Sequence, residues 1–237
     1  MGNLAIYATK GFEYLLILGF LALFTLFYLY FTSHRFETAT ATVTSQIVDR
    51  LVDWFRVPDN IFFHQAHTWV RREESAPALV VVGMDDFAQK MAGPLELWDI
   101  PAPGTTIRQG DKGWSLHDGK KSVDMLMPMS GKVVAINKDV LAAMKNGTYI
   151  DSELSRDPYE KGWILKVKPD DFERERKGLL SGTLARKWMG EVVEQLRSKM
   201  SPELGGVMQD GGVPVAGMAK NITGEEWDLL LKEFFLT

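Results

Sequence analysis

The chain has 237 residues, of which 46% are hydrophobic and 24% are charged, so most of it has the composition of a globular protein. Its formal net charge of −4 argues against a dedicated nucleic-acid binder, which would carry a basic face. Cysteine is absent, which excludes disulfides, thiolate zinc sites and cysteine nucleophiles within this chain. Any thiol chemistry would therefore need a cofactor.

A long apolar run near the start predicts a membrane anchor. Residues 14–33 contain no charged side chain, and at 1.5 Å per residue such a run spans about 30 Å, the thickness of a bilayer core. We therefore expect residues 1–35 to be a single-pass transmembrane anchor in the cell membrane, with the span over 14–33. A cleaved signal peptide is the main alternative, although its apolar core is usually shorter. Lys10 precedes the run while Arg35 and Arg50 follow it, which favours a cytoplasmic C-terminal part.

Residues 36–61 are predicted to form a linker and an amphipathic juxtamembrane helix. The stretch at 34–44 is polar and rich in threonine. Within 45–55, apolar residues recur at spacings of three and four, which is typical of an amphipathic helix, and Pro58 follows its end. Its apolar stripe could lie on the membrane surface or on the domain that follows.

Short β-type runs separated by turn signals fill residues 62–172 and predict a mainly β domain, built as a sandwich or a barrel. One helix is expected at 84–94, opened by an acidic turn and closed before a Gly-Pro pair. We expect the strands to lie within residues 67–73, 77–83, 106–128, 131–137 and 162–169.

Residues 173–237 are predicted to form a helical C-terminal extension. In its first helix, apolar residues stand four apart on one face, namely Leu184, Trp188, Val192, Leu196 and Met200. A second helix is expected to begin at Thr223, because Glu226 follows at the spacing of a capping box. We expect both helices to pack on the β domain or on another subunit, and truncation at Gly178 to leave the β domain folded.

The strongest functional signal lies in residues 114–137, which predict a hairpin followed by another strand. Asp118-Gly119 is a pair favoured where the central residues of a hairpin turn need positive φ. The turn would place Lys120 on an exposed, protruding tip. A plain solvated lysine in a polar turn is the alternative interpretation.

A set of short motifs is spread over residues 62–172. Its members are His67-Thr68-Trp69-Val70, 83–89, Leu97-Trp98-Asp99-Ile100-Pro101, Gly104, Gly110, Asp124, Pro128, Ser130, Gly131, Val133-Val134, Asp157-Pro158-Tyr159 and Gly162-Trp163. Together with the lysine at the hairpin tip, these motifs resemble the glycine-cleavage H-protein family of lipoyl or biotinyl carrier-type domains. The resemblance implies a lipoyl-carrier-like fold, a barrel-sandwich hybrid.

The resemblance also implies a modified residue. In the family, the lysine that carries lipoate lies eight residues before a proline, and counting back from Pro128 lands on Lys120. The cofactor-binding residue implied is therefore Lys120, with covalent lipoate as the cofactor; Lys121 is the alternative acceptor. His117-Asp118-Gly119 stands where the family has Glu-Ser-Val, and the acidic residue lost at position 117 is one that lipoylating enzymes meet in this family.

By resemblance, the chain is a membrane-tethered carrier and not an enzyme. The family passes an aminomethyl group from a pyridoxal-phosphate glycine decarboxylase to a folate-dependent aminomethyltransferase, and a flavin dihydrolipoyl dehydrogenase reoxidises the dithiol. The expected partners are membrane lipid and these glycine-cleavage enzymes or a membrane-bound complex, with no nucleic acid. The alternative is an unmodified structural or docking subunit of a membrane complex, which the departures at 117–121 and the added helices favour.

Other residues admit two interpretations each. His67 and Trp69 are expected to serve the fold rather than chemistry. His117 is either a turn residue or a proton-transfer group, since the unperturbed pKa of histidine is about 6.5. Met125, Met127 and Met129 alternate on one strand face, where methionine usually fills the core but could bind a soft metal such as Cu(I). The acidic pairs Asp85-Asp86 and Asp170-Asp171 are expected at helix starts.

Overall fold

The computed structural model describes residues 14–28, 54–93, 95–146, 157–200 and 216–237. Contacts divide the chain into two units, Met1–Asp49 and Arg50–Thr237. In the first unit, residues 14–28 form a helix whose apolar side chains are exposed along its length. The remainder of the predicted span, residues 29–33, lies outside the described residues. Among the helices that the structure describes, none combines the length and the apolar character needed to cross a membrane.

The predicted linker and amphipathic helix also lie outside the described residues up to position 53. The second unit is described from Trp54 onward, and Phe55 is already buried in its core. The ring of Phe55 meets that of Phe87 edge-on at 5.1 Å between centroids. The chain is therefore attached to the core of the second unit from this point.

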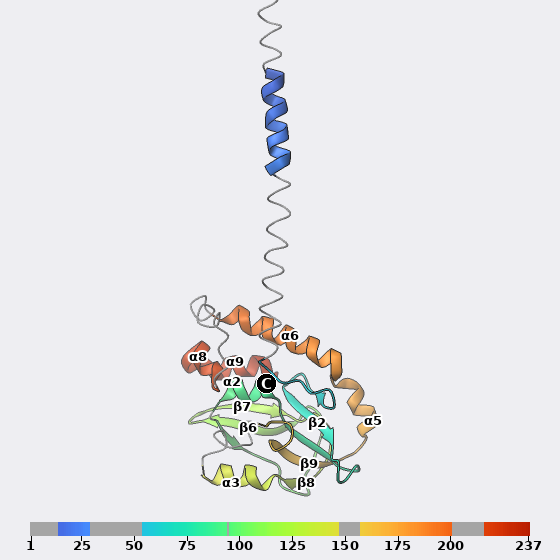
Figure 1. Ribbon diagram of the computed structural model, residues 1–237. Helices are drawn as coiled ribbons and strands as arrows, with labels where there is room; N and C mark the ends of the chain where they lie inside the picture. Colours follow the sequence, from blue (N-terminus) through green and yellow to red (C-terminus); the bar gives the residue numbers. More distant parts are fainter. Residues whose placement is uncertain (1–13, 29–53, 94, 147–156, 201–215) are drawn as a thin grey trace, which may run out of the picture. The chain divides into compact units, whose positions relative to one another are not determined.

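A six-stranded antiparallel sheet forms one layer of the second unit (Figure 1). Every neighbouring pair in it is antiparallel, and strands far apart in sequence, such as β3 and β9, lie side by side. The sheet confirms the prediction of a mainly β domain. Its order is β1 (Phe62–Phe63), β2 (Thr68–Arg72), β3 (Val80–Met84), β9 (Trp163–Pro169), β8 (Gly131–Ile136) and β5 (Thr106–Ile107).

A second antiparallel sheet has the order β4 (Glu96–Trp98), β6 (Lys112–Asp118) and β7 (Lys121–Leu126). Side chains alternate between the faces of a strand, and in β7 and its continuation Val123, Met125, Met127 and Met129 are all buried. The prediction that these methionines fill the core is confirmed. The inner faces of both sheets contribute to one buried apolar cluster.

Helix α2 (Asp86–Ala92) follows β3, where one helix was predicted. The carboxylate of Asp85 accepts a hydrogen bond from the Ala88 amide at 2.7 Å, as an N-cap does, and Gly93 ends the helix with φ 66°. Asp171 caps α5 (Phe172–Glu175) in the same way through the Arg174 amide. Both acidic helix starts are therefore confirmed. Helix α3 (Lys138–Asn146) and the 3-10 turn η2 (Arg176–Gly178) were not predicted.

The apolar stripe of α6 (Gly182–Lys199) differs from the predicted one. Leu184 is 58% exposed, so its assignment to the buried face was wrong. A strict spacing of four drifts by about 40° per step on a helix of 3.6 residues per turn, so the predicted series leaves the buried face at its ends. The buried residues combine spacings of one, three and four, namely Ala185, Met189, Val192, Val193 and Leu196.

The last helix begins later than predicted. Thr223 ends α8 (Met218–Thr223), and its hydroxyl donates to the Ala219 carbonyl at 3.0 Å instead of capping a new helix. A 3-10 turn, η4 (Gly224–Glu226), then leads into α9 (Trp227–Phe235). The predicted capping box was therefore wrong. The apolar face of α9 is buried and includes Trp227, Leu230, Leu231 and Phe234.

The C-terminal helices share the core of the sheets. Side chains of α6, α8 and α9 belong to the same buried cluster as Val82, Trp114 and Met125. At the start of α8, the Gly217 amide donates to the Lys90 carbonyl at 2.9 Å, and a Cβ on Gly93 would lie 2.3 Å from the Gly217 Cα. Of the two predicted alternatives, packing on the β domain is the one observed.

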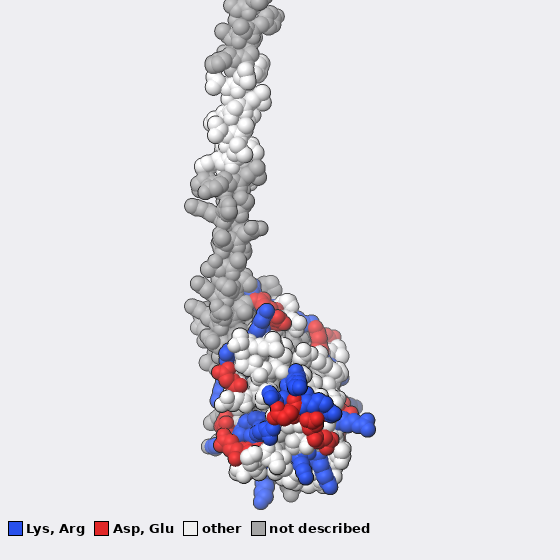
Figure 2. All heavy atoms as spheres, turned by 90° about the vertical axis from the view of Figure 1, so that its right-hand side faces the viewer, with Lys and Arg blue, Asp and Glu red and all other residues white. Residues whose placement is uncertain are grey.

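Charged side chains of both signs lie next to one another on the face that carries α5 (Figure 2). Glu173 accepts from Arg176 at 2.6 Å and from Arg72 at 2.8 Å. These two hydrogen bonds hold the pKa of Glu173 below its usual value, and the one from Arg176 has the larger effect. The guanidinium of Arg72 also lies 4.3 Å from the centre of the Phe172 ring. Ion pairs therefore link neighbouring charges of opposite sign on this face.

Candidate functional site

The hairpin of β6 and β7 presents Lys120 at its tip. Asp118 pairs with Lys121 across the two strands, so the loop consists of Gly119 and Lys120 alone. Gly119 has φ 60° while Lys120 has negative φ, which is the pattern of a type II′ turn with glycine in first place. The exposed tip was predicted correctly, but the central residues of the turn are one position later than the Asp118-Gly119 pair suggested.

The two adjacent lysines of the tip differ in their surroundings. The side chain of Lys120 is exposed and forms no hydrogen bond or ion pair with any described residue. Lys121 Nζ lies 3.1 Å from Asp228 Oδ1 and also donates to the Glu225 carbonyl. Lys120 is therefore the amine of this hairpin that a second molecule can reach without breaking a contact.

The C-terminal helices hold the other side of the tip as well. Lys220 of α8 forms an ion pair with Asp118, and its Nζ lies 5.6 Å from the centre of the Trp227 ring. Strand β7 and α9 lie against each other. Both residues that flank the two-residue loop are thus attached to the segment 216–237.

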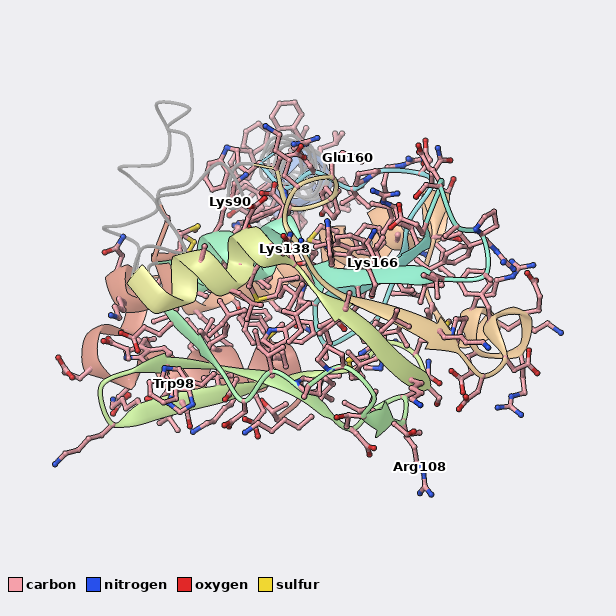
Figure 3. The ribbon with its side chains drawn as sticks, turned by 90° about the horizontal axis from the view of Figure 1, so that it is seen from below. Lys90, Trp98, Arg108, Lys138, Glu160 and Lys166 are labelled. Atoms are coloured by element: carbon pink, nitrogen blue, oxygen red, sulfur yellow. The ribbon has the colours of Figure 1, made fainter. Side chains whose placement is uncertain are left out.

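His117 lies near the tip but within β6, opposite Ser122, and is not a residue of the loop. Its Nε2 is 3.0 Å from Ser115 Oγ, which donates to Asp99 Oδ2 at the same distance. The indole of Trp98, 52% exposed, lies 5.5 Å from the imidazole, beside the hairpin (Figure 3). The polar contacts of His117 are therefore with a surface network, and its proton-transfer role stays a hypothesis.

Lys112 completes that network. Its Nζ lies 2.8 Å from Asp99 Oδ2 and 3.0 Å from Asp124 Oδ1. Hydrogen bonds to these two carboxylates raise the pKa of Lys112, and hydrogen bonds from Lys112 and Ser115 lower the pKa of Asp99. The network therefore keeps Lys112 and Asp99 ionised on the three-stranded sheet.

His67 and Trp69 are structural, as predicted. His67 is 1% exposed, and its Nδ1 lies 2.8 Å from Asp85 Oδ2. Its ring stacks on Phe87 at 4.2 Å and lies 4.8 Å from that of Trp188 in α6. Trp69 Nε1 donates to the Met84 carbonyl at 2.8 Å. Both side chains are enclosed by the core and by the C-terminal helices.

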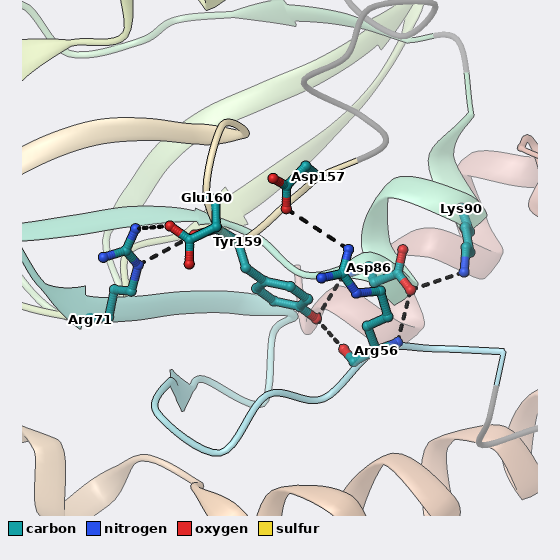
Figure 4. A network of polar contacts seen from close by, with 7 residues as sticks. All are labelled: Arg56, Arg71, Asp86, Lys90, Asp157, Tyr159 and Glu160. Atoms are coloured by element: carbon teal, nitrogen blue, oxygen red, sulfur yellow. Dashed lines mark hydrogen bonds and ion pairs between the residues drawn. The ribbon is translucent and has the colours of Figure 1, made fainter.

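A network of hydrogen bonds around Tyr159, the Tyr159 network, was not predicted from the sequence (Figure 4). The Tyr159 hydroxyl donates to the Arg56 carbonyl and accepts from the Asp86 amide at 3.1 Å. Asp86 Oδ2 accepts from the Arg56 amide at 2.8 Å and from Lys90 Nζ at 2.9 Å. Burial raises the pKa of Tyr159 well above its usual value, so this hydroxyl keeps its proton. The Tyr159 network joins residues 54–56 to α2 through hydrogen bonds.

Comparison with known proteins identifies the family of this chain. The model of the glycine cleavage H-protein family matches residues 61–192. A glycine cleavage system H protein of Prochlorococcus marinus (strain NATL2A) is 32% identical over 133 residues, which cover 56% of this chain and 96% of that protein. The chain belongs to the glycine cleavage H-protein family. Its members are lipoyl carriers rather than catalysts, and the prediction that the chain is not an enzyme agrees with this membership.

Two further relatives have the same description. The glycine cleavage system H protein of Anaeromyxobacter sp. (strain K) is 30% identical over 115 residues, covering 48% of this chain and 82% of that protein. A crystal structure of a glycine cleavage system H protein from Mycobacterium marinum matches 57% of this chain and 98% of that one, with 24% identity and a TM-score of 0.43.

The family match ends before the residues that contact the hairpin tip. It extends beyond the predicted limit of 172 and stops at residue 192, within α6. The residues that hold the hairpin tip, Lys220, Glu225 and Asp228, lie after that limit. The carrier-type domain of the family is thus supplemented here by helices that contact the presented lysine's neighbours.

Proposed function

We propose that the chain is a lipoyl carrier in which lipoate is joined to Lys120 by an amide bond. The observation that carries the proposal is the position of Lys120, exposed and unpaired on a two-residue tip, in the family's register to Pro128. The tip is open beside Lys120, because a Cβ added to Gly119 would have no atom within 4 Å among the described residues. Bound lipoate would supply the thiols that a chain without cysteine lacks.

The proposed partners are the enzymes of glycine cleavage. In this role a lipoyl-carrier-like domain, a barrel-sandwich hybrid, presents the end of Lys120 in turn to a decarboxylase, an aminomethyltransferase and a dihydrolipoyl dehydrogenase. The residues of this chain position the amine and perform no chemistry. Family membership supports the proposal, and the identity of the transferred group follows from the family alone.

We further propose a single-pass anchor over residues 14–33 with the C-terminal part in the cytoplasm. The uncharged run supports this, as do the apolar side chains exposed all round the helix at 14–28, such as Leu18 and Phe24. Tethering raises the effective concentration of the carrier at neighbouring partners, so it favours partners in a membrane-bound complex.

The anchor predicts that the full-length protein sediments with membranes and resists carbonate extraction. Deleting residues 1–35 is expected to move the protein into the soluble fraction, because no other described segment exposes a continuous apolar helix surface. The measurement is membrane fractionation with immunoblotting. Full-length protein that stays soluble without detergent would rule the anchor out.

An unmodified docking subunit is the second candidate. It is favoured by His117-Asp118-Gly119, which replaces the family's Glu-Ser-Val, and by the ion pairs that attach Asp118 and Lys121 to the C-terminal helices. In this role the fold would serve assembly, and the hairpin would be a fixed part of an interface.

Mass spectrometry separates the two candidates. Protein purified from its own host, under conditions in which other carriers are lipoylated, is expected to show a lipoyl adduct in its intact mass. Peptide mapping is expected to place the adduct on Lys120, because that amine is unpaired. An unmodified Lys120 in this material would favour the docking subunit.

A further inference from the structure

Of the two neighbouring lysines at the hairpin tip, Lys121 is held by α9 and its preceding turn, while Lys120 has no hydrogen bond or ion pair with a described residue. We propose that Asp228 and the Glu225 carbonyl bind Lys121 so that Lys120 is the lysine of this hairpin that accepts an acyl group. The proposal rests on the proposed lipoylation and adds the residues that determine which lysine is selected.

The first step of the argument is the position of Asp228. It lies in the first turn of α9, is 9% exposed, and faces β7. Its Oδ2 accepts from Lys232 at 3.3 Å within the same helix, which orients Oδ1 toward Lys121 at 3.1 Å. Although burial opposes it, hydrogen bonds from Lys121 and Lys232 keep the pKa of Asp228 below its usual value. A fixed carboxylate anion therefore faces Lys121 at neutral pH.

The second step is the geometry of the tip. Lys220 binds Asp118 on one side of the loop, while Asp228 and Glu225 bind Lys121 on the other. These contacts fix both strand ends at the two-residue loop. Lys120 is the lysine between them that no described residue contacts through a hydrogen bond or ion pair.

The third step is the chemistry of acylation. An amide forms when the unprotonated Nζ attacks an activated acyl carbon; the N–C bond forms, the activating group leaves, and the nitrogen loses its remaining extra proton. The contacts that hold Lys121 Nζ to Asp228 and to the Glu225 carbonyl must break before this amine can attack. Lys120 has no such contact with a described residue, so an acyl donor such as an acyl adenylate or active ester reacts first at Lys120.

The test measures amine reactivity without any lipoylating enzyme. Full-length protein, shown by intact mass to be unmodified, is treated with limiting N-hydroxysuccinimidyl acetate, and labelling at each lysine is followed by peptide mapping. Lys120 is expected to react about two- to fivefold faster than Lys121, which is the size of effect that partly exposed ion pairs produce. Equal rates in the unaltered protein would overturn the proposal, whether or not any variant folds.

Two variants sharpen the result. Asp228→Asn removes the anion and is expected to raise labelling of Lys121 toward that of Lys120, with Lys120 unchanged. Lys199→Gln removes an ion pair with Glu233 of α9 that does not involve Asp228, so it is expected to leave the ratio unaltered. No rise at Lys121 in folded Asp228→Asn, as judged by circular dichroism, would also overturn the proposal. A host protein without lipoate would refute the proposed function and leave these labelling ratios untouched.

Discussion

Lys120→Arg is expected to reduce carrier activity to the background measured without the protein. Arginine keeps the positive charge, but its guanidinium stays protonated and cannot form the amide that attaches lipoate. The change lies at an exposed tip, so the free energy of unfolding is expected to change by no more than about 0.5 kcal/mol. The measurement is glycine cleavage reconstituted with a decarboxylase, an aminomethyltransferase and a dihydrolipoyl dehydrogenase, after lipoylation of each variant.

Lys121→Arg is the matched control. Arginine at position 121 can keep the ion pair with Asp228, so this variant is expected to retain activity. Glycine cleavage activity that survives in Lys120→Arg would show that the transferred group is not carried on residue 120. Loss of activity in both variants would instead point to a general need for lysine on the hairpin.

Deleting residues 217–237 is expected to unfold the unit that begins at Arg50. The deletion removes α8 and α9, whose buried side chains include Trp227, Leu231 and Phe235. Each large apolar side chain contributes about 1.5–3 kcal/mol when fully buried. The five that α9 buries are together comparable with the about 5–15 kcal/mol that stabilises a typical domain, namely Trp227, Leu230, Leu231, Phe234 and Phe235. The expectation from sequence that a shortened chain keeps its β domain therefore changes. Thermal unfolding followed by circular dichroism tests it.

Two leucines of α9 give a finer comparison in the full-length chain. Leu231 has no exposed surface and Leu229 is 59% exposed, two positions away on the same helix. Leu231→Ala is expected to cost about 2–5 kcal/mol, whereas Leu229→Ala should cost no more than about 0.5 kcal/mol. A truncated protein that melts like the intact one, or two equal leucine effects, would show that α9 is not part of the core.

The regular elements of the β domain could be predicted because their side chains alternate over five or more residues, as in β7 and β8. Helix α2 was equally clear, since an acidic cap and a terminal glycine delimit it. Strands of two or three residues, such as β1 and β4, are too short to show a period. The short α8 is set by contact between Gly93 and Gly217, which no local pattern encodes.

Part of the site could also be predicted, because it depends on local sequence. The Asp-Gly pair and the register to Pro128 located the tip, because turn chemistry and spacing are local properties. The ion pairs of Asp118 with Lys220 and of Lys121 with Asp228 join residues about a hundred positions apart, so spacing carries no information about them. The Tyr159 network is likewise formed by three segments that are distant in the sequence.

The two-residue loop also determines how the lysine can move. With Asp118 and Lys121 paired across the strands and each tied to the C-terminal helices, the backbone of Lys120 is fixed at a point. Displacement of the amine must then come from rotation about the side-chain bonds, which takes picoseconds to nanoseconds at an exposed position, and not from slower movement of a loop. In NMR relaxation, Gly119 and Lys120 would have the backbone order parameters of a strand, while the Lys120 Cε–Hε groups reorient freely. The hairpin would hold the backbone of Lys120 in place, and a partner would need only to come within reach of this one rotating side chain.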